Sequence, residues 1–198
     1  MEFEYEMGAS DLYEIDVTAD DSDRVSDSII SFDVSDNHVI AVGFSNSYIG
    51  IYDKDGEWIS GFSLETYGGM YYLAWQEDTL WIYTVRNRLA VHVTDVTSVR
   101  VSAAQVYKIK DNKANEAVWR ELRSQNTVET DGAVYEMMQT LPWGSHSDTI
   151  VKHLPDGTSM ECISVRKENV ENMFVAVLWL LLGVAVLFIC LEPKKRKS

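Results

Sequence analysis

The sequence predicts a mainly β protein of antiparallel sheets, with one short inserted helix and a C-terminal helix that crosses a membrane. Three observations lead to this prediction: an internal repeat with a period of about 40 residues, short apolar stretches separated by turn-forming residues, and an uncharged apolar run near the C-terminus. The chain has 198 residues, which is enough for one domain and an anchor. We expect a β-rich domain in residues 28–165, preceded by an N-terminal strand and an acidic connector in residues 1–27.

The composition is acidic, with a formal net charge of −14. The last residues are basic, so the part of the chain that precedes them is more acidic still. Nucleic acids bind basic surfaces, and we therefore expect no nucleic-acid partner. Hydrophobic residues make up 46% of the chain and aromatic residues 11%, which argues for a packed core rather than a disordered segment.

Cysteine is present only at Cys162 and Cys190. Because Cys190 lies in the apolar run, it is not expected to meet Cys162 within one chain. The sequence therefore predicts no disulfide framework, and it leaves the redox compartment open.

The internal repeat aligns the segment that begins at Phe32 with the segment that begins at Tyr72, without a gap. Apolar positions recur between the two copies while polar positions drift, as expected when only the buried face is constrained. The matched apolar pairs are Phe32 and Tyr72, Ile40 and Leu80, Val42 and Ile82, Ile49 and Leu89, and Ile51 and Val91. A third, looser copy begins at Gly132 and continues from Asp148 to about Val165.

Each copy is expected to form strands joined by tight turns. The strands expected in the first two copies are Val39–Phe44, Tyr48–Tyr52, a third that carries Trp58 and Phe62, Leu80–Val85 and Leu89–Val93. Asp53–Gly56 supplies Asp and Gly where a hairpin needs a positive φ angle. In the third copy, the Pro-Asp-Gly sequence that begins at Pro155 predicts a similar turn.

Two segments outside the repeats have their own expected structure. Residues 111–125 predict an inserted amphipathic helix, capped by Asp111 or Asn112 and lying on the sheets. Its apolar spacing is carried by Ala114, Ala117, Val118, Glu121 and Leu122. Near the N-terminus we expect a strand at Leu12–Val17, followed by a polar acidic connector from Thr18.

The period, the hairpins and the Asp-x-Asp-Gly turn resemble the blades of β-propellers of the NHL or lactonase-like kind, which occur in many bacterial envelope proteins. The resemblance covers roughly Ser28 to Val165 and implies antiparallel, propeller-like blades. Propellers have about 4–8 blades, whereas this chain offers three or four, so the ring would be incomplete. The alternatives are a split propeller, an open stack of β-meanders and a β-sandwich. Bare strand edges would favour self-association.

The apolar run from Met173 to Leu191 contains no charged residue and is long enough to cross a bilayer as a helix, which needs about 20 residues. The alternative is a hydrophobic tail that docks on a partner protein. Residues 166–172 would form a juxtamembrane segment and residues 192–198 a basic tail. The tail residues expected to determine topology are Lys194, Lys195, Arg196 and Lys197, which favour a cytoplasmic C-terminus and a domain outside.

The start of the chain complicates this orientation, because it has neither a basic region nor an apolar region of a signal peptide. Two explanations remain: an upstream signal is missing from this sequence, or the protein is tail-anchored and its domain stays in the cytosol. We favour the first, which places a single-pass protein in the cell membrane with an extracytoplasmic domain.

No segment carries a motif that identifies a reaction. His146, Asp148 and His153 are close in sequence but lack a metal-ligand pattern, and the acidic cluster from Asp20 to Asp27 lacks EF-hand spacing. The Gly61–Glu65 segment lacks the second glycine of a serine-nucleophile elbow. We therefore predict no catalytic, cofactor-binding or metal-binding residue, and no cofactor.

Aromatic residues are the remaining candidates for function. Those inside strand patterns are expected in the core: Trp58, Trp75, Trp81 and Tyr83. Trp143, in a Pro-Trp-Gly loop, and Trp119, on the helix, are candidate partner contacts. The resulting hypothesis is a membrane-anchored domain for recognition, sensing or assembly at the cell surface. Its partners would be the lipid bilayer and an unidentified protein or small-molecule ligand. The alternatives are a membrane-tethered hydrolase or lactonase-like enzyme and a non-functional fragment of a larger propeller.

Overall fold

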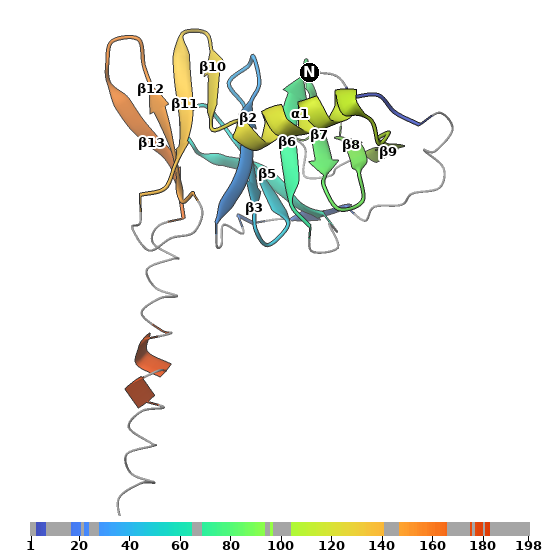
Figure 1. Ribbon diagram of the computed structural model, residues 1–198. Coiled ribbons are helices and arrows are strands. Elements are labelled where there is room, and N and C mark those ends of the chain that lie inside the picture. Colours follow the sequence, from blue (N-terminus) through green and yellow to red (C-terminus); the bar gives the residue numbers. More distant parts are fainter. Residues whose placement is uncertain are drawn as a thin grey trace, which may run out of the picture.

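The computed structural model describes residues 3–6, 17–20, 22–23, 28–64, 69–93, 96, 104–140, 147–165, 175, 177–179 and 181–182. Within these residues it forms three antiparallel sheets and one α-helix outside the apolar tail (Figure 1). The predicted mainly β class is thereby confirmed.

The first sheet has five strands in the order β1-β5-β4-β3-β2. They are β1 (Val17–Asp20), β2 (Ile29–Val34), β3 (Ile40–Phe44), β4 (Tyr48–Tyr52) and β5 (Trp58–Leu64). Every residue of β3 and β4 is buried, because sheets pack on both faces of these strands. In the turn between β4 and β5, Asp53 accepts hydrogen bonds from the N–H groups of Asp55 and Glu57, both at 2.9 Å. Gly56 has a φ of 87°, as the predicted hairpin requires.

The second and third sheets each have four strands in sequence order. The second contains β6 (Tyr71–Gln76), β7 (Thr79–Thr84), β8 (Leu89–Val93) and β9 (Ala104–Lys108). The third contains β10 (Thr127–Thr130), β11 (Ala133–Met138), β12 (Thr149–His153) and β13 (Ser159–Ser164). Helix α1 (Lys113–Ser124) connects the two sheets and is capped by Asn112, one of the two predicted caps.

The N-terminal strand differs from its prediction. Strand β1 starts at Val17 and includes Thr18 to Asp20, which were expected to belong to the acidic connector; residues 12–16 lie outside the described part. The reason is tertiary pairing: β1 adds to the outer edge of β5, from Val17 opposite Leu64 to Asp20 opposite Gly61. Backbone pairing with an existing edge overrides the polar composition of this segment.

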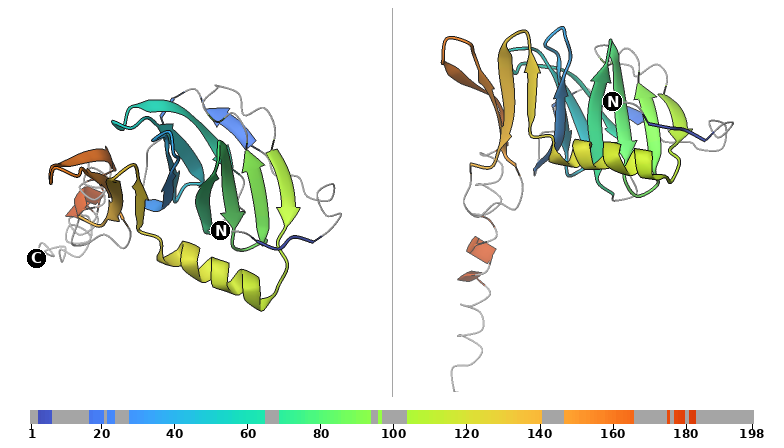
Figure 2. Two further views of the ribbon diagram at one scale, coloured as in Figure 1. Left: turned by 90° about the horizontal axis from the view of Figure 1, so that it is seen from above. Right: turned by 45° about the horizontal axis from the view of Figure 1, so that its top comes forward.

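The three sheets are arranged as a fan in which the first sheet lies between the other two (Figure 2). One apolar cluster joins the first and third sheets, with Phe32, Tyr48, Tyr135 and Ile150 among its members. A second cluster joins the first and second sheets, with Ile49, Phe62, Leu73 and Ile82 among its members. The last sheet in the sequence therefore packs against the first sheet, on the side away from the second. Strand β2 contacts both β6 and the β10–β11 pair, so the leading strands of the sheets meet at the inner side of the fan.

Helix α1 covers the face of the second sheet that points away from the first. Trp119 and Leu122 are buried there in a cluster with Phe3, Tyr72 and Tyr83. The buried helix positions are Asn115, Trp119 and Leu122, whereas Ala114, Ala117 and Glu121 of the predicted face are exposed. The prediction followed the small alanines, while the largest side chain, Trp119, determines which face is buried.

In the part of the apolar segment that the structure describes, residues 175, 177–179 and 181–182 are helical. Among the described residues, no helix meets the length and hydropathy needed to span a bilayer.

Candidate interaction surfaces

The structure places only one of the two predicted contact residues. Trp119 is 3% exposed, and the centroid of its indole ring lies 4.9 Å from the centroid of the Phe3 ring. It therefore stabilises the docked helix and is not accessible to a partner. Trp143 and the basic residues Lys194, Lys195, Arg196 and Lys197 lie outside the described residues. The role expected for Trp119 is therefore corrected, and those of the other five residues stay predictions.

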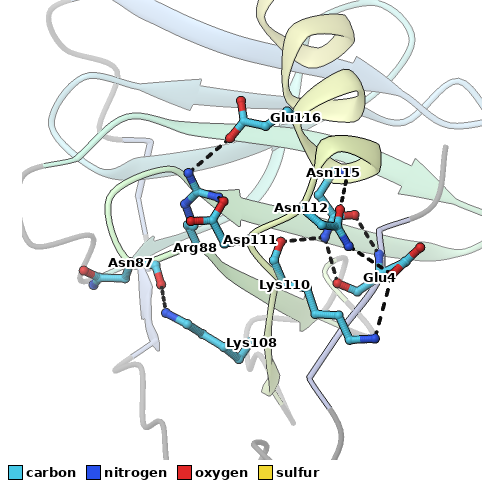
Figure 3. Close-up of polar contacts among 9 residues, drawn as sticks. All are labelled: Glu4, Asn87, Arg88, Lys108, Lys110, Asp111, Asn112, Asn115 and Glu116. Atoms are coloured by element: carbon cyan, nitrogen blue, oxygen red, sulfur yellow. Dashed lines mark hydrogen bonds and ion pairs between the residues drawn. The ribbon is translucent and has the colours of Figure 1, made fainter.

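A polar network fixes the start of α1 to the N-terminal segment (Figure 3). The buried Asn115 amide accepts from the Glu4 N–H at 2.9 Å and donates to the backbone oxygens of Glu4 and Lys110 at 2.9 and 2.8 Å. Arg88 forms ion pairs with Asp111 at 2.7 Å and with Glu116 at 3.1 Å. Every group in this network has a protein partner, which indicates a structural role in docking the helix.

N-terminal segments lie against two of the three outer sheet edges, one along a whole strand and one only at a strand end. Strand β1 pairs with β5 along the first sheet. The segment around Tyr5 continues the edge near the end of β9, where the Glu6 N–H donates to the Lys108 oxygen and the Lys110 N–H donates to the Glu4 oxygen. On the third sheet, by contrast, β13 is the terminal strand among the described residues.

The third sheet has one apolar face and one polar face. Tyr135 and Ile150 point toward the first sheet and belong to the shared core. Strand alternation puts Glu136, Val151 and Glu161 together on the opposite face, where register pairs Val151 with both glutamates. This outward face has no counterpart of α1 over it among the described elements.

Charged side chains around this outward face are mainly acidic. His153 lies on it, with Nε2 3.2 Å from the Glu136 carboxylate and Nδ1 2.8 Å from the Ser159 hydroxyl. The neighbouring lysine of β12 faces the other way: Lys152 is buried, and its Nζ donates to the Lys54 backbone oxygen at 3.3 Å. A ligand that approaches β13 from the outward face therefore meets carboxylates.

An aromatic stack lies on the second sheet beside the helix. The Trp81 ring is stacked on His92 at 4.9 Å between centroids and lies 6.0 Å from Tyr5 and 5.7 Å from Tyr107. All four side chains are half-buried. Tyr83, also expected in the core, is fully buried, whereas Trp58, Trp75 and Trp81 are partly buried against core clusters.

Polar side chains of β2 bond to the backbone of β6 and thereby join two sheets. The Ser31 hydroxyl accepts from the Leu73 N–H at 2.9 Å, and the Asp33 carboxylate accepts from the Trp75 N–H at 2.6 Å. Burial raises the pKa of Asp33 from 3.8 to about 6, against the opposing effect of its N–H donors. This arrangement locks the inner strands and needs no ligand to satisfy it.

The residues weighed as metal or catalytic candidates have local roles where they are described. Asp148 accepts hydrogen bonds from Thr140 and Thr149, and Asp23 accepts from the Tyr52 hydroxyl at 2.9 Å. Gly61 to Leu64 belong to β5. In the described residues no three His, Cys, Asp or Glu side chains are grouped as metal ligands; His146, Asp21 and Asp27 lie outside them.

No family model matches the chain, and no curated protein matches it. Among solved structures it is similar to a catalytically inactive variant of virginiamycin B lyase from Staphylococcus aureus with quinupristin, at 13% identity and a TM-score of 0.36. The selenomethionine-substituted form of that lyase gives 15% identity and the same TM-score. Both alignments cover 75% of this chain and 45% of the lyase chain.

Proposed function

We propose that this chain is a membrane-anchored, propeller-like binding module, which holds its β domain at the cell surface for recognition of a partner. The propeller-like description is supported by three antiparallel meanders that fan out from adjacent inner strands, as blades do around an axis. Two of the meanders follow one another with a common period in the sequence.

The observation that carries the proposal is the exposure of apolar helical side chains in the tail. Trp179 is 70% exposed and Leu181 59%, and Val175, Val177, Leu178 and Leu182 are each about half exposed. Moving apolar surface out of water lowers the free energy by about 25 cal/mol per Å², so a run of such residues favours transfer into lipid. The uncharged sequence from Met173 to Leu191 extends this apolar surface to the length of a bilayer crossing.

Membrane sedimentation tests the anchor. The full chain is expected to stay in the membrane pellet after an alkaline carbonate wash and to enter the supernatant only with detergent. A variant with Leu178→Arg and Leu182→Arg should be released, because arginine at the centre of a spanning helix costs about 2.5 to 3.5 kcal/mol per residue. The matched control, Leu178→Ile with Leu182→Ile, should remain in the pellet. Full-length chain in the supernatant without detergent would refute the proposal.

Protease treatment of intact cells tests the location of the domain. With the basic tail in the cytoplasm, externally added protease should cleave the β domain without cell lysis. Cleavage that occurs only after lysis would place the domain in the cytosol and leave a tail-anchored protein.

A further inference from the structure

We propose that the outer edge of β13 binds an extended segment of a partner protein, which adds a strand to the third sheet and carries basic side chains on its outward face. This inference rests on the proposed recognition function and names the surface that would perform it. Its test is independent of the sedimentation assay, so the two can fail separately.

Some backbone groups of β13 are directed away from the sheet. The Leu154 N–H donates to the Thr158 carbonyl oxygen at 2.8 Å, so the backbone of Thr158 faces β12 at the hairpin turn that precedes β13. In an antiparallel pair the backbone groups of alternate residues face the neighbour. Those of Ser159 and Glu161 are therefore directed away from β12, and both residues are exposed.

N-terminal segments pair with the other two outer edges of the fold. Strand β1 lies against β5, and the segment around Tyr5 lies against the end of β9. Of the three outer strands, β13 is the one without such a strand among the described residues. The regular part of this edge runs from Ser159 to Glu161 and includes no Pro or Lys, residues that commonly protect an edge from pairing. It ends at Cys162, where a β-bulge shifts the register of β13 against β12.

A second copy of the chain does not fit this edge. Two identical edges related by a two-fold axis pair antiparallel. Centred on Glu161, such a pair would place Glu161 opposite Glu161, and like charges directly opposite are destabilising. It would also send the two C-terminal segments, which follow β13, toward opposite ends of the joined strands, although both must enter one bilayer.

The side chains around the edge determine which partner chemistry fits. On the outward face, an added strand would meet Glu161 first, and Glu136 lies two strands further in. On the inward face it would meet Met160, which is 37% exposed; Cys162, further along, is in contact with Gly56 of the turn between β4 and β5. The segment that fits best alternates basic residues outward with apolar residues inward.

A labelled peptide of alternating lysine and valine is the probe. Fluorescence anisotropy of the peptide, titrated with the full chain in an uncharged detergent, should rise to saturation. A peptide with the same side chains but N-methyl groups on alternate backbone nitrogens should not bind, because it cannot complete the ladder. Hydrogen exchange at the Ser159 and Glu161 amides should slow in the presence of the first peptide alone.

Three variants locate the binding. Glu161→Pro removes an outward N–H on an edge strand, where proline is tolerated, and should weaken binding about tenfold or more. Glu161→Gln should weaken it less and remove most of its salt dependence. Glu129→Gln, on the opposite edge strand of the same sheet, should leave the affinity unchanged.

Three results would contradict strand addition at β13. Equal binding of the N-methylated peptide would show charge attraction only, and absence of any anisotropy change would rule out strand addition by this class of segment. A Cys190→Ser chain that forms a Cys162 disulfide dimer under mild oxidation would show that a second copy occupies the edge. Each of these results overturns the proposal, while the membrane assay reports separately on the anchor.

Discussion

The Asp33 carboxylate accepts a hydrogen bond from the backbone N–H of Trp75 at 2.6 Å, which ties the inner strand of the first sheet to that of the second. The same carboxylate accepts from the Val34 N–H at 2.9 Å and from the Gln125 amide at 3.3 Å, just beyond α1. One buried acid thus connects two sheets and the end of the helix that covers the second. Its protonation state should therefore affect the stability of the whole arrangement.

The contribution of Asp33 to stability is expected to fall as pH rises from about 4 to about 6. Burial raises the pKa of Asp33 from 3.8 to about 6, so the folded protein holds a proton that the unfolded chain has lost in this window. The free energy of unfolding then decreases with pH by up to about 3 kcal/mol from this group. Urea unfolding at several pH values should show this decrease, and Asp33→Asn should remove it. Asp36→Asn, in an exposed turn, is the control. Parallel profiles for the wild type and Asp33→Asn would contradict the assignment.

Trp119 should be the most costly helix residue to truncate. Its indole lies in the cluster formed with Phe3, Tyr72 and Tyr83, and replacing a buried aromatic residue with alanine costs about 3 to 5 kcal/mol. Trp119→Ala should lower the thermal midpoint strongly and weaken helix docking, as measured by calorimetry and circular dichroism. Glu121→Ala, on the exposed side of the same helix, should change the midpoint little. Similar midpoints for the two variants would argue against this packing.

The local elements could be predicted from sequence where the pattern was strong. The strands around Val42, Ile51, Ile82 and Val91 were found because a buried strand gives a continuous apolar run and the turns carry Asp and Gly. Strand β10 was missed because Thr127–Thr130 is short and polar, and it becomes a strand by pairing with β11. Strand β9 was missed because a longer connection precedes it and breaks the period.

The long-range arrangement could not be predicted in the same way. Nothing in the repeat indicates that the third sheet packs against the first rather than the second. That choice depends on complementary side chains such as Phe32 and Tyr135, and on α1 covering the second sheet. The place of β13 as the terminal strand of the third sheet, among the described residues, was likewise hidden, because it depends on where β1 and the Tyr5 segment pair. The sequence predicted that bare strand edges would exist, but it did not indicate which strand would form one.

Replacing Asn115 with alanine should destabilise the protein more than replacing Asn112, the N-cap of α1. Its side chain is 1% exposed, and its truncation leaves the Glu4 N–H and two backbone oxygens without these bonds. An unsatisfied buried polar group costs about 1 to 3 kcal/mol, so Asn115→Ala should destabilise the protein and expose the N-terminal segment to proteolysis. Asn112→Ala removes the cap, for about 1 kcal/mol, and an exposed hydrogen bond of 3.0 Å to the Glu4 carboxylate, and it should leave most of the protection of that segment in place. Equal proteolysis of both variants would show that the Asn115 amide does not hold it.

Position 61 should tolerate only glycine, because the ring of Tyr48 packs directly against its backbone. A Cβ atom at Gly61 would lie 2.6 Å from Cε2 of Tyr48, too close for van der Waals contact, and the ring is enclosed in the core. Gly61→Ala should therefore destabilise by about 1 to 3 kcal/mol through overpacking. Gly61→Ala combined with Tyr48→Leu should lose less than the sum of the single changes, as measured by urea unfolding. Simple additivity would mean that the two residues do not compete for space.

The orientation of the proposed anchor should depend on the basic tail. The four basic residues of the tail follow the apolar segment after Glu192 and Pro193, and they are Lys194, Lys195, Arg196 and Lys197. On the other side of the segment, Arg166 and Lys167 are offset by Glu168 and Glu171. Positive charge near a spanning helix is retained in the cytoplasm, so replacing the four tail residues with glutamine should remove the bias. Protease protection in intact cells would then show a mixture of domain orientations, where the wild type shows one. Replacing Arg166 and Lys167 instead should strengthen the original orientation. A tail variant that keeps a single orientation would show that another signal sets the topology.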